Sequence, residues 1–266
     1  MPRRLSYIAV EGPQDVEFIG RLLKHGDFTW VKMKVEVDAA FTPLTELRFP
    51  VGDDLTRRMP VPHFYQTATH AVAVHASQGE SNLAKNTIES LDLVRRPVES
   101  VGFVMDDDSN PNPASRLEEL NKQLGRQAKP AQFTLPAVLA VVQPGPPRTG
   151  VYVLPDNESP GTLEDLLLDC AGINYLYPAV AASNFVRKVD RSTLCTEERK
   201  NLQKGSNEKK AHVGAIVSLL RPGKTTQVSI HNNRWLDGDA VNSPRIDAFR
   251  VFLSDLLNEP VRQLRM

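Results

Sequence analysis

Short hydrophobic runs alternate along this chain with longer stretches in which hydrophobic residues recur every three or four positions. The runs have the length and composition of buried strands, and they cover residues 5–10, 70–76, 98–105 and 151–155. The amphipathic stretches predict helices that follow each strand, over residues 15–23, 79–94, 115–128 and 161–170, with a final helix over 244–257. Strands that alternate with helices predict a doubly wound α/β fold with a mainly parallel sheet.

Two regions depart from this alternation. Residues 31–68 begin with a strand-like pattern and are then broken by Pro and Gly, which predicts a β-rich insertion after the first helix. Beyond residue 187 the pattern is helical and charged, with a Lys-rich run over 199–210. We therefore predict an α/β domain over residues 1–190, with a helical C-terminal extension over 191–266 packed on the same domain.

Composition narrows the class of protein. The chain has 266 residues with 32 Lys and Arg against 32 Asp and Glu, so a globally basic nucleic-acid binder is excluded and any such attraction must be local. Its two cysteines, Cys170 and Cys195, have no zinc-site spacing. Neither a signal peptide nor a run of about 18 apolar residues is present, which predicts a cytoplasmic protein without a membrane span.

Acidic residues gather where the predicted strands end. Glu11 follows the first strand, Asp106 and Asp108 follow the third, and Glu164 and Asp165 begin the helix after the fourth. The carboxyl ends of parallel strands meet at one edge of a sheet, and residues two apart on extended backbone face the same way. Converging carboxylates repel one another unless a hard cation such as Mg²⁺ neutralises them. The pattern thus predicts a metal site at this edge.

Each of these residues also has a structural interpretation. Glu11 alone is typical of a solvated turn, and the segment 106–113 (DDDSNPNP) has good turn chemistry. Glu164 and Asp165 would be stabilised by the dipole at a helix start even without a ligand. We expect Asp107 to point away from its two neighbours and to be solvated.

Three segments resemble motifs of the TOPRIM family. IAVEGPQDVEFI is similar to the first motif, in which a strand ends in Glu-Gly and an Asp follows three residues later, and VGFVMDDDSN is similar to the Asp-x-Asp motif. GVYVLPDNESPGTLEDLLLD resembles a segment of TOPRIM-only relatives of the OLD-type nucleases. The likeness covers residues 5–24, 70–125 and 150–172.

This resemblance implies a TOPRIM-like nuclease, a hydrolase that uses Mg²⁺ or Mn²⁺ to cleave phosphodiester bonds in DNA or RNA. The implied metal ligands are Glu11, Asp15, Asp106 and Asp108, with Glu164 and Asp165 for a second ion. A lysine near the scissile phosphate would be Lys210 or its neighbour Lys209. OLD-type proteins also imply a role in defence against phage or mobile elements and a separate ABC-type ATPase partner, because residues 221–227 (RPGKTTQ) lack the first glycine of a phosphate-binding loop.

Two other functions are compatible with the same residues. A non-catalytic TOPRIM module could bind metal or nucleic acid as a subunit of a larger complex. A phosphatase or response-regulator-like protein also has acids at its strand ends, but it requires a nucleophilic Asp where this chain has Glu11. Nucleic-acid cleavage that depends on Asp106 distinguishes the nuclease from both.

Overall fold

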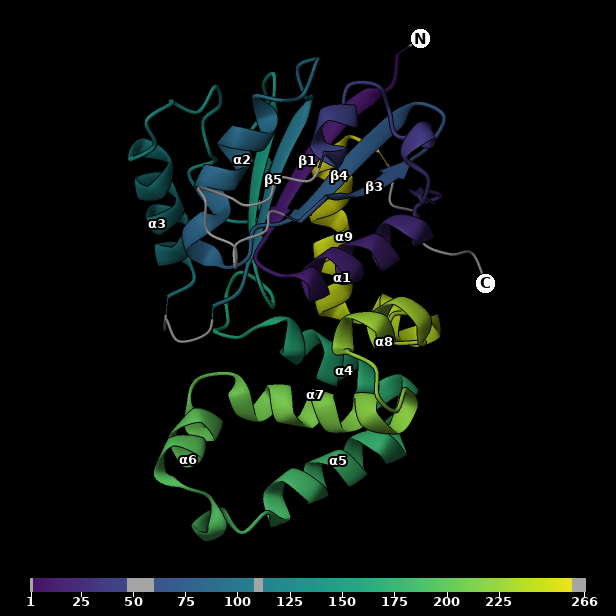
Figure 1. The fold of residues 1–266 in the computed structure, drawn as a ribbon, viewed down its shortest axis with the longest axis vertical. Coiled ribbons are helices and arrows are strands. Elements are labelled where there is room, and N and C mark those ends of the chain that lie inside the picture. Colours follow the sequence, from purple (N-terminus) through teal and green to yellow (C-terminus); the bar gives the residue numbers. More distant parts are fainter. Residues whose placement is uncertain (1, 47–59, 108–111, 260–266) are drawn as a thin grey trace.

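A six-stranded sheet lies at the centre of the molecule (Figure 1). The structure is a computed structural model that describes residues 2–46, 60–107 and 112–259. The strands are β1 (Arg4–Val10), β2 (Thr29–Val31), β3 (His63–Gln66), β4 (His70–Ala76), β5 (Ser100–Met105) and β6 (Arg148–Val153). Their order is β2-β3-β4-β1-β5-β6, in which β4, β1, β5 and β6 are parallel and the β2–β3 pair adds an antiparallel edge. The predicted mainly parallel sheet is confirmed.

Helices cover both faces of this sheet, as expected for a doubly wound α/β protein. The helices are α1 (Pro13–His25), α2 (Leu83–Leu91), α3 (Ala114–Gly125), α4 (Leu163–Asn174), α5 (Leu176–Lys188), α6 (Thr196–Gln203), α7 (Asn207–Leu220), α8 (Thr226–Asn232) and α9 (Pro244–Leu257). One hydrophobic core joins α2 and α3 to one face, and a second core joins α1, α4, α8 and α9 to the other.

Strand β1 shows why the chain needs helices on both sides. Leu5, Tyr7 and Ala9 point into one core, whereas Ile8 and Val10 point into the other. Successive side chains of a strand alternate between faces, so a continuous hydrophobic run buries both. The predicted strand positions therefore follow directly from hydrophobic runs that lack polar alternation.

The two regions that departed from the sequence pattern take distinct places. The predicted β-rich insertion over 31–68 is only partly correct: β3 lies within it, but β2 ends at its first residue, and the strand-like pattern that follows forms the 3-10 helix Lys34–Glu36. A second 3-10 helix, Thr42–Thr45, comes next, and residues 47–59 lie outside the described part of the chain. In the C-terminal part, α5, α6 and α7 form a lobe below the sheet, and α9 returns to pack on β5 and β6 (Figure 1). No helix among the described residues is both long and apolar enough to cross a membrane.

Helix α9 approaches the sheet closely because two strand glycines leave room for it. A Cβ atom at Gly150 would lie 2.7 Å from Cε2 of Phe252, and one at Gly102 would lie 2.5 Å from Cδ2 of Leu256. The Phe252 ring sits against Tyr152 and Phe249 at centroid distances of 5.2 and 6.1 Å, so it has little freedom to move.

Gly150→Ala is therefore expected to destabilise the protein by about 1–3 kcal/mol, the usual penalty for overpacking a core. Gly125→Ala is the matched control, because nothing lies within 4 Å of a Cβ at that position at the end of α3. Urea denaturation measures both variants. Equal midpoints for Gly150→Ala and wild type would mean that α9 does not pack on the sheet as described.

Candidate carboxylate site

The candidate site lies where the strand order changes direction. After β1 the chain crosses to β4 on one side, and it then crosses back to β5 on the other side of β1. In open α/β sheets such a switch point opens a crevice at the carboxyl ends of the two diverging strands. Glu11 follows β1 here, and Asp106 follows β5.

Glu11 and Asp106 are held side by side by the backbone. The Asp106 N–H donates to Oε1 of Glu11 at 3.1 Å. The same Glu11 oxygen accepts from Nη2 of Arg116, on α3, at 3.0 Å, and the Glu11 side chain is 19% exposed. Two carboxylates far apart in the sequence thus converge, and a guanidinium from a third element balances one of them.

Asp15 joins this pair from the first turn of α1. It is 7% exposed, and it accepts a hydrogen bond of 2.8 Å from the N–H of Gly12. The pKa of Asp15 is raised to about 7, chiefly by burial and also by the negative charges of Glu11 and Glu164, while the Gly12 N–H and Lys210 oppose the shift. The electrostatic coupling places these carboxylates in one cluster.

The pKa of Asp106 is also raised well above its usual range, chiefly by burial and then by the charges of Asp15, Glu11 and Glu164. One Asp106 oxygen accepts from the N–H of Leu163 at 3.0 Å, which ties β5 to the start of α4. Positive dipole at a helix N-terminus favours a carboxylate there. Asp106 therefore lies between two elements whose backbones both help to orient the cluster.

Glu164 and Asp165 follow different paths at the start of α4. Glu164 is 4% exposed, accepts from the Thr162 hydroxyl at 2.7 Å and belongs to the cluster. Asp165 instead caps the helix by accepting from the Thr162 N–H at 2.9 Å, and it forms an ion pair of 2.6 Å with Lys209. Lys210 lines a cleft together with the carboxylates of the cluster.

The Asp triplet shows one error in the sequence reasoning. Asp107 was expected to be solvated, but it is 1% exposed. The Asp107 N–H donates to the Gly161 carbonyl at 2.7 Å, and the Gly161 N–H donates to the Asp107 carbonyl at 3.0 Å. This β-bridge buries Asp107. Asp108, a predicted metal ligand, lies outside the described residues.

The cluster opens into a cleft of about 350 Å³. Glu11, Asp15, Asp106 and Glu164 line it together with Lys210, so its donors are hard carboxylate oxygens of the kind that Mg²⁺ and Mn²⁺ prefer. In the described part of the chain, no three His, Cys, Asp or Glu side chains are already arranged to hold a metal ion. Several of these oxygens instead accept from backbone N–H groups or from Arg116. The donor chemistry fits a divalent ion, which would replace these partners.

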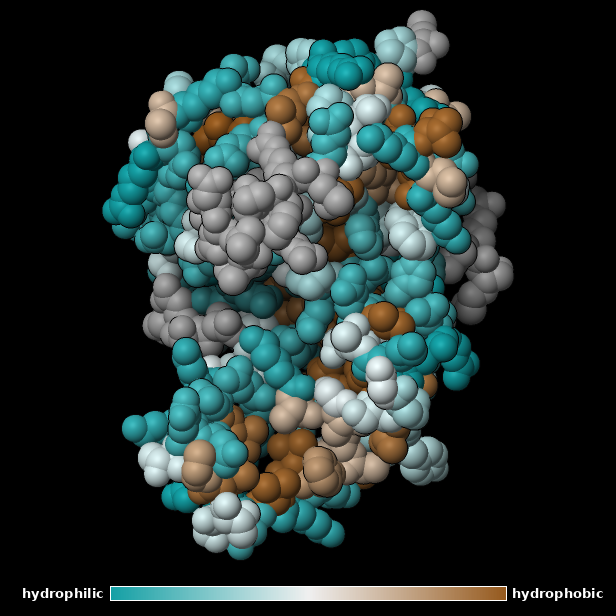
Figure 2. Space-filling view, in the orientation of Figure 1, coloured by the Kyte–Doolittle hydropathy of each residue, from teal (hydrophilic) through white to brown (hydrophobic). Residues whose placement is uncertain are grey.

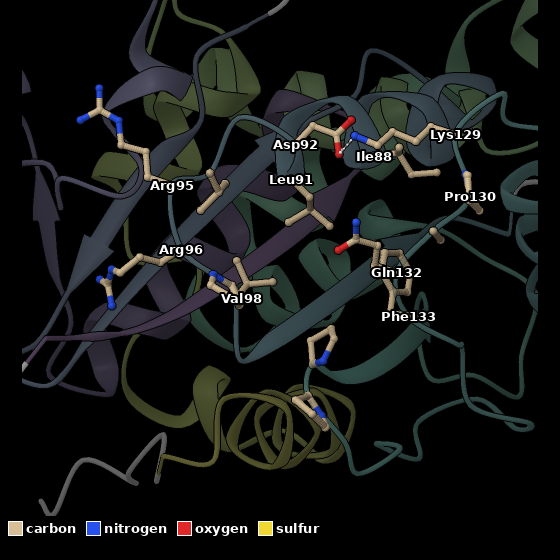
Figure 3. Close-up of a pocket in the computed structure, with 15 residues that line it drawn as sticks. Ile88, Leu91, Asp92, Arg95, Arg96, Val98, Lys129, Pro130, Gln132 and Phe133 are labelled. Atoms are coloured by element: carbon tan, nitrogen blue, oxygen red, sulfur yellow. Dashed lines mark ion pairs between the residues drawn. The ribbon is translucent and has the colours of Figure 1, made fainter.

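A larger cavity, of about 450 Å³, lies elsewhere, among the loops that precede β5 and β6 (Figure 3). Its walls mix hydrophobic side chains such as Leu91, Val98 and Phe133 with polar ones, and its acid Asp92 is paired with Lys129 at 2.7 Å. Arg95 and Arg96 project away from the cavity in this view. Charged groups do not converge there as they do in the carboxylate cleft, so the cleft is the better candidate for chemistry.

Arg116 is the site residue that sequence reasoning missed. Besides Glu11, it pairs through Nη1 with Glu80 in the turn before α2, so it links three segments around the cleft. The amphipathic pattern of 115–128 identified the helix that carries Arg116. It gave no indication that this polar position faces β1, because that depends on how the helix packs on the sheet.

Comparison with known proteins identifies a family. Residues 6–258 match the family described as "Protein of unknown function (DUF3226)", and the chain belongs to this family. No curated protein matches the chain. Among solved structures, the crystal structure of the hypothetical protein PH0156 from Pyrococcus horikoshii OT3 is similar, with 18% identity, 95% of each chain covered and a TM-score of 0.48.

The raised pKa of Asp15 makes the stability of the metal-free protein depend on pH. In the unfolded chain Asp15 titrates near 3.8, whereas in the folded protein it titrates near 7. Between these values the unfolded chain has released a proton that the folded protein keeps, so stability falls as the pH rises through this window. Asp15→Asn can still accept from Gly12 but carries no charge.

We expect Asp15→Asn to be more stable than wild type at about pH 8 in a chelator, by on the order of 2 kcal/mol, and the two to converge near pH 4. Denaturant unfolding at several pH values measures this difference. The control is Glu99→Gln, at an exposed carboxylate beside the amino end of β5. Parallel pH profiles for wild type and Asp15→Asn would contradict the clustering of these charges.

Proposed function

We propose that this protein is a divalent-metal-dependent nuclease that hydrolyses phosphodiester bonds. The observation that carries the proposal is the convergence of four carboxylates and Lys210 on one cleft at the switch point of the sheet. The motif resemblance to TOPRIM proteins supports the same chemistry from the sequence, since Glu11, Asp15 and Asp106 occupy the matching positions.

In this proposal Glu11, Asp106 and Glu164 hold the metal, with Asp15 beside them. A bound Mg²⁺ or Mn²⁺ supplies positive charge against the oxygens of the reacting phosphodiester. Lys210, which lines the same cleft, provides a cation for the charge that develops on the phosphate. Arg116 keeps Glu11 oriented and balances it before substrate enters.

The resemblance to OLD-type proteins extends the proposal to biological context. A role in defence against phage or mobile elements, with an ABC-type ATPase supplied by another chain, is consistent with the missing phosphate-binding loop at 221–227. The partner can be tested directly: a tagged copy of this protein, expressed from its own genome, should co-purify with such an ATPase.

Asp106→Asn is expected to lower cleavage of plasmid DNA or of RNA by about a hundredfold or more in Mg²⁺ or Mn²⁺, because it removes a central metal-holding charge while keeping side-chain size. Gel-based nicking and RNA-cleavage assays measure the rates. Glu99→Gln, a loss of the same charge at an exposed position outside the cleft, should cleave like wild type. Undiminished cleavage by Asp106→Asn would defeat the nuclease proposal.

Metal binding has its own readout in the absence of any substrate. At a Mn²⁺ concentration about 100 times its Kd, binding stabilises a folded protein by about 2.7 kcal/mol, so the Tm of wild type should rise on titration. Asp106→Asn should lose most of this rise, and Glu99→Gln should keep it. A Tm of wild type that does not respond to Mg²⁺ or Mn²⁺ would contradict a metal site in the cleft.

A further inference from the structure

The α5–α7 lobe (residues 176–220) has a charge that the chain as a whole lacks. It contains eight Lys and Arg and four Asp and Glu, although the full sequence is balanced at 32 of each. The remainder of the chain therefore has 24 basic and 28 acidic residues. A surplus of four positive charges is thus concentrated on three helices next to an acidic cleft.

The acids of this lobe are largely occupied by local partners. Asp190 accepts from the N–H of Ser192, Glu198 accepts from the N–H of Cys195 at the start of α6, and Glu208 pairs with Arg191 at 3.1 Å. These interactions hold the three carboxylates in local contacts, so none of them forms an ion pair with Arg187, Lys188, Lys200 or Lys204 within the described residues.

Five cations of the lobe, by contrast, have no ion pair within the described residues: Arg187, Lys188, Arg199, Lys200 and Lys204. All five are exposed. Long, unpaired cationic side chains on one lobe form the electrostatic footprint of a polyanion-binding surface.

Exposed aromatic rings lie on α5, the helix that also carries the cations Arg187 and Lys188. Tyr177 is 85% exposed and Phe185 is 66% exposed, and both project from the solvent side of α5, where Lys188 also lies. The opposite side of α5 is buried through Ala182 and Val186. In the space-filling view, hydrophobic surface appears between hydrophilic patches on this lobe (Figure 2). Aromatic rings with free faces beside cations are typical of proteins that stack the bases of single strands.

The lobe and the carboxylate cleft share helix α7. Lys204 lies just before α7, and Lys210, in the first turn of that helix, lines the carboxylate cleft. Helix α5 packs along α7, so the aromatic and cationic groups of α5 belong to the same packed lobe as Lys210. Lys210 in turn lines the carboxylate cleft.

We propose that the α5–α7 lobe binds single-stranded nucleic acid, with its unpaired cations on the phosphates and with Tyr177 and Phe185 stacked on bases, and delivers the strand to the carboxylate cleft. The delivery step rests on the nuclease proposal, whereas the binding itself does not. A duplex would contact only the cations, through its phosphates, because its paired bases are not free to stack on the two aromatic rings.

Fluorescence anisotropy in a chelator tests the binding without cleavage. The probes are labelled dT and rU strands of about 30 nucleotides, which exceed the span of a single small binding module. Lys200→Glu/Lys204→Glu is expected to weaken binding at least about tenfold and to flatten the slope of log K against log salt by about 1.4, which is two phosphate contacts on a single strand. The matched control, Lys122→Glu/Arg126→Glu, reverses two exposed cations at the end of α3 that form no ion pair with any residue the structure describes.

A second pair of variants isolates stacking. Tyr177→Ser/Phe185→Ser should weaken binding of both strands about fivefold or more with an unchanged salt slope. The exposed Val138→Ser/Val141→Ser pair should have no effect. Retention of wild-type affinity by both lobe variants, or a preference for duplex over single strands, would overturn the proposal.

The failure of one proposal can be told from the failure of the other. Asp106→Asn should keep wild-type affinity for the strands in a chelator while it loses cleavage. Binding that depends on the lobe in a protein without metal-dependent cleavage would overturn the nuclease and leave the lobe assignment standing. Cleavage of single strands with unchanged KM in both lobe variants would overturn the lobe assignment alone.

Discussion

The structure depends on backbone N–H groups that hold carboxylates together against their mutual repulsion. Asp106 donates its N–H to Glu11, Leu163 donates to Asp106, and Gly12 donates to Asp15. Each bond joins the end of a strand or the start of a helix to an acid of the cluster. A buried charge costs several kcal/mol unless it is paired or hydrogen-bonded, so the fold can tolerate this arrangement only with such donors in place. The raised pKa of Asp15 and of Asp106 shows that the compensation is incomplete.

Much of this arrangement could be predicted because it depends on local sequence and on a general property of parallel sheets. Hydrophobic runs located β1, β4, β5 and β6 to within a few residues but not the edge strands β2 and β3, and the acids that follow β1 and β5 were expected to meet at one sheet edge. Interactions set by tertiary packing could not be read in the same way. Arg116 faces Glu11 because of how α3 docks, and Asp107 is buried because its backbone bridges to Gly161, more than fifty residues away. A polar residue in an amphipathic pattern carries no signal for either.

Charge is divided between the two parts of the molecule in a way that total composition conceals. Net neutrality argued against a globally basic protein, and that inference holds for the chain as a whole. The Lys-rich run over 199–210 and the acids at the strand ends were both visible in the sequence, but nothing in the composition indicated that they would lie side by side in the fold. Fields of opposite sign close together on a surface attract a polyanion to one part and repel it from the other. Under the proposed function, a divalent ion in the cleft would offset the negative charge there, so that the cleft no longer repels a polyanion held on the lobe.

This division of charge gives a reason for the partners of the carboxylates, which accept hydrogen bonds from backbone N–H groups and from Arg116. In the absence of metal, an open cluster of four acids would repel nucleic acid held on the adjacent lobe. The Glu11–Arg116 pair and the protonation favoured by the raised pKa of Asp15 and Asp106 both lower that negative charge. Under the proposed function, metal and substrate favour each other's binding, because a divalent cation offsets the negative charge that would otherwise repel the phosphates. The affinity for single strands and the affinity for the divalent ion should then be linked.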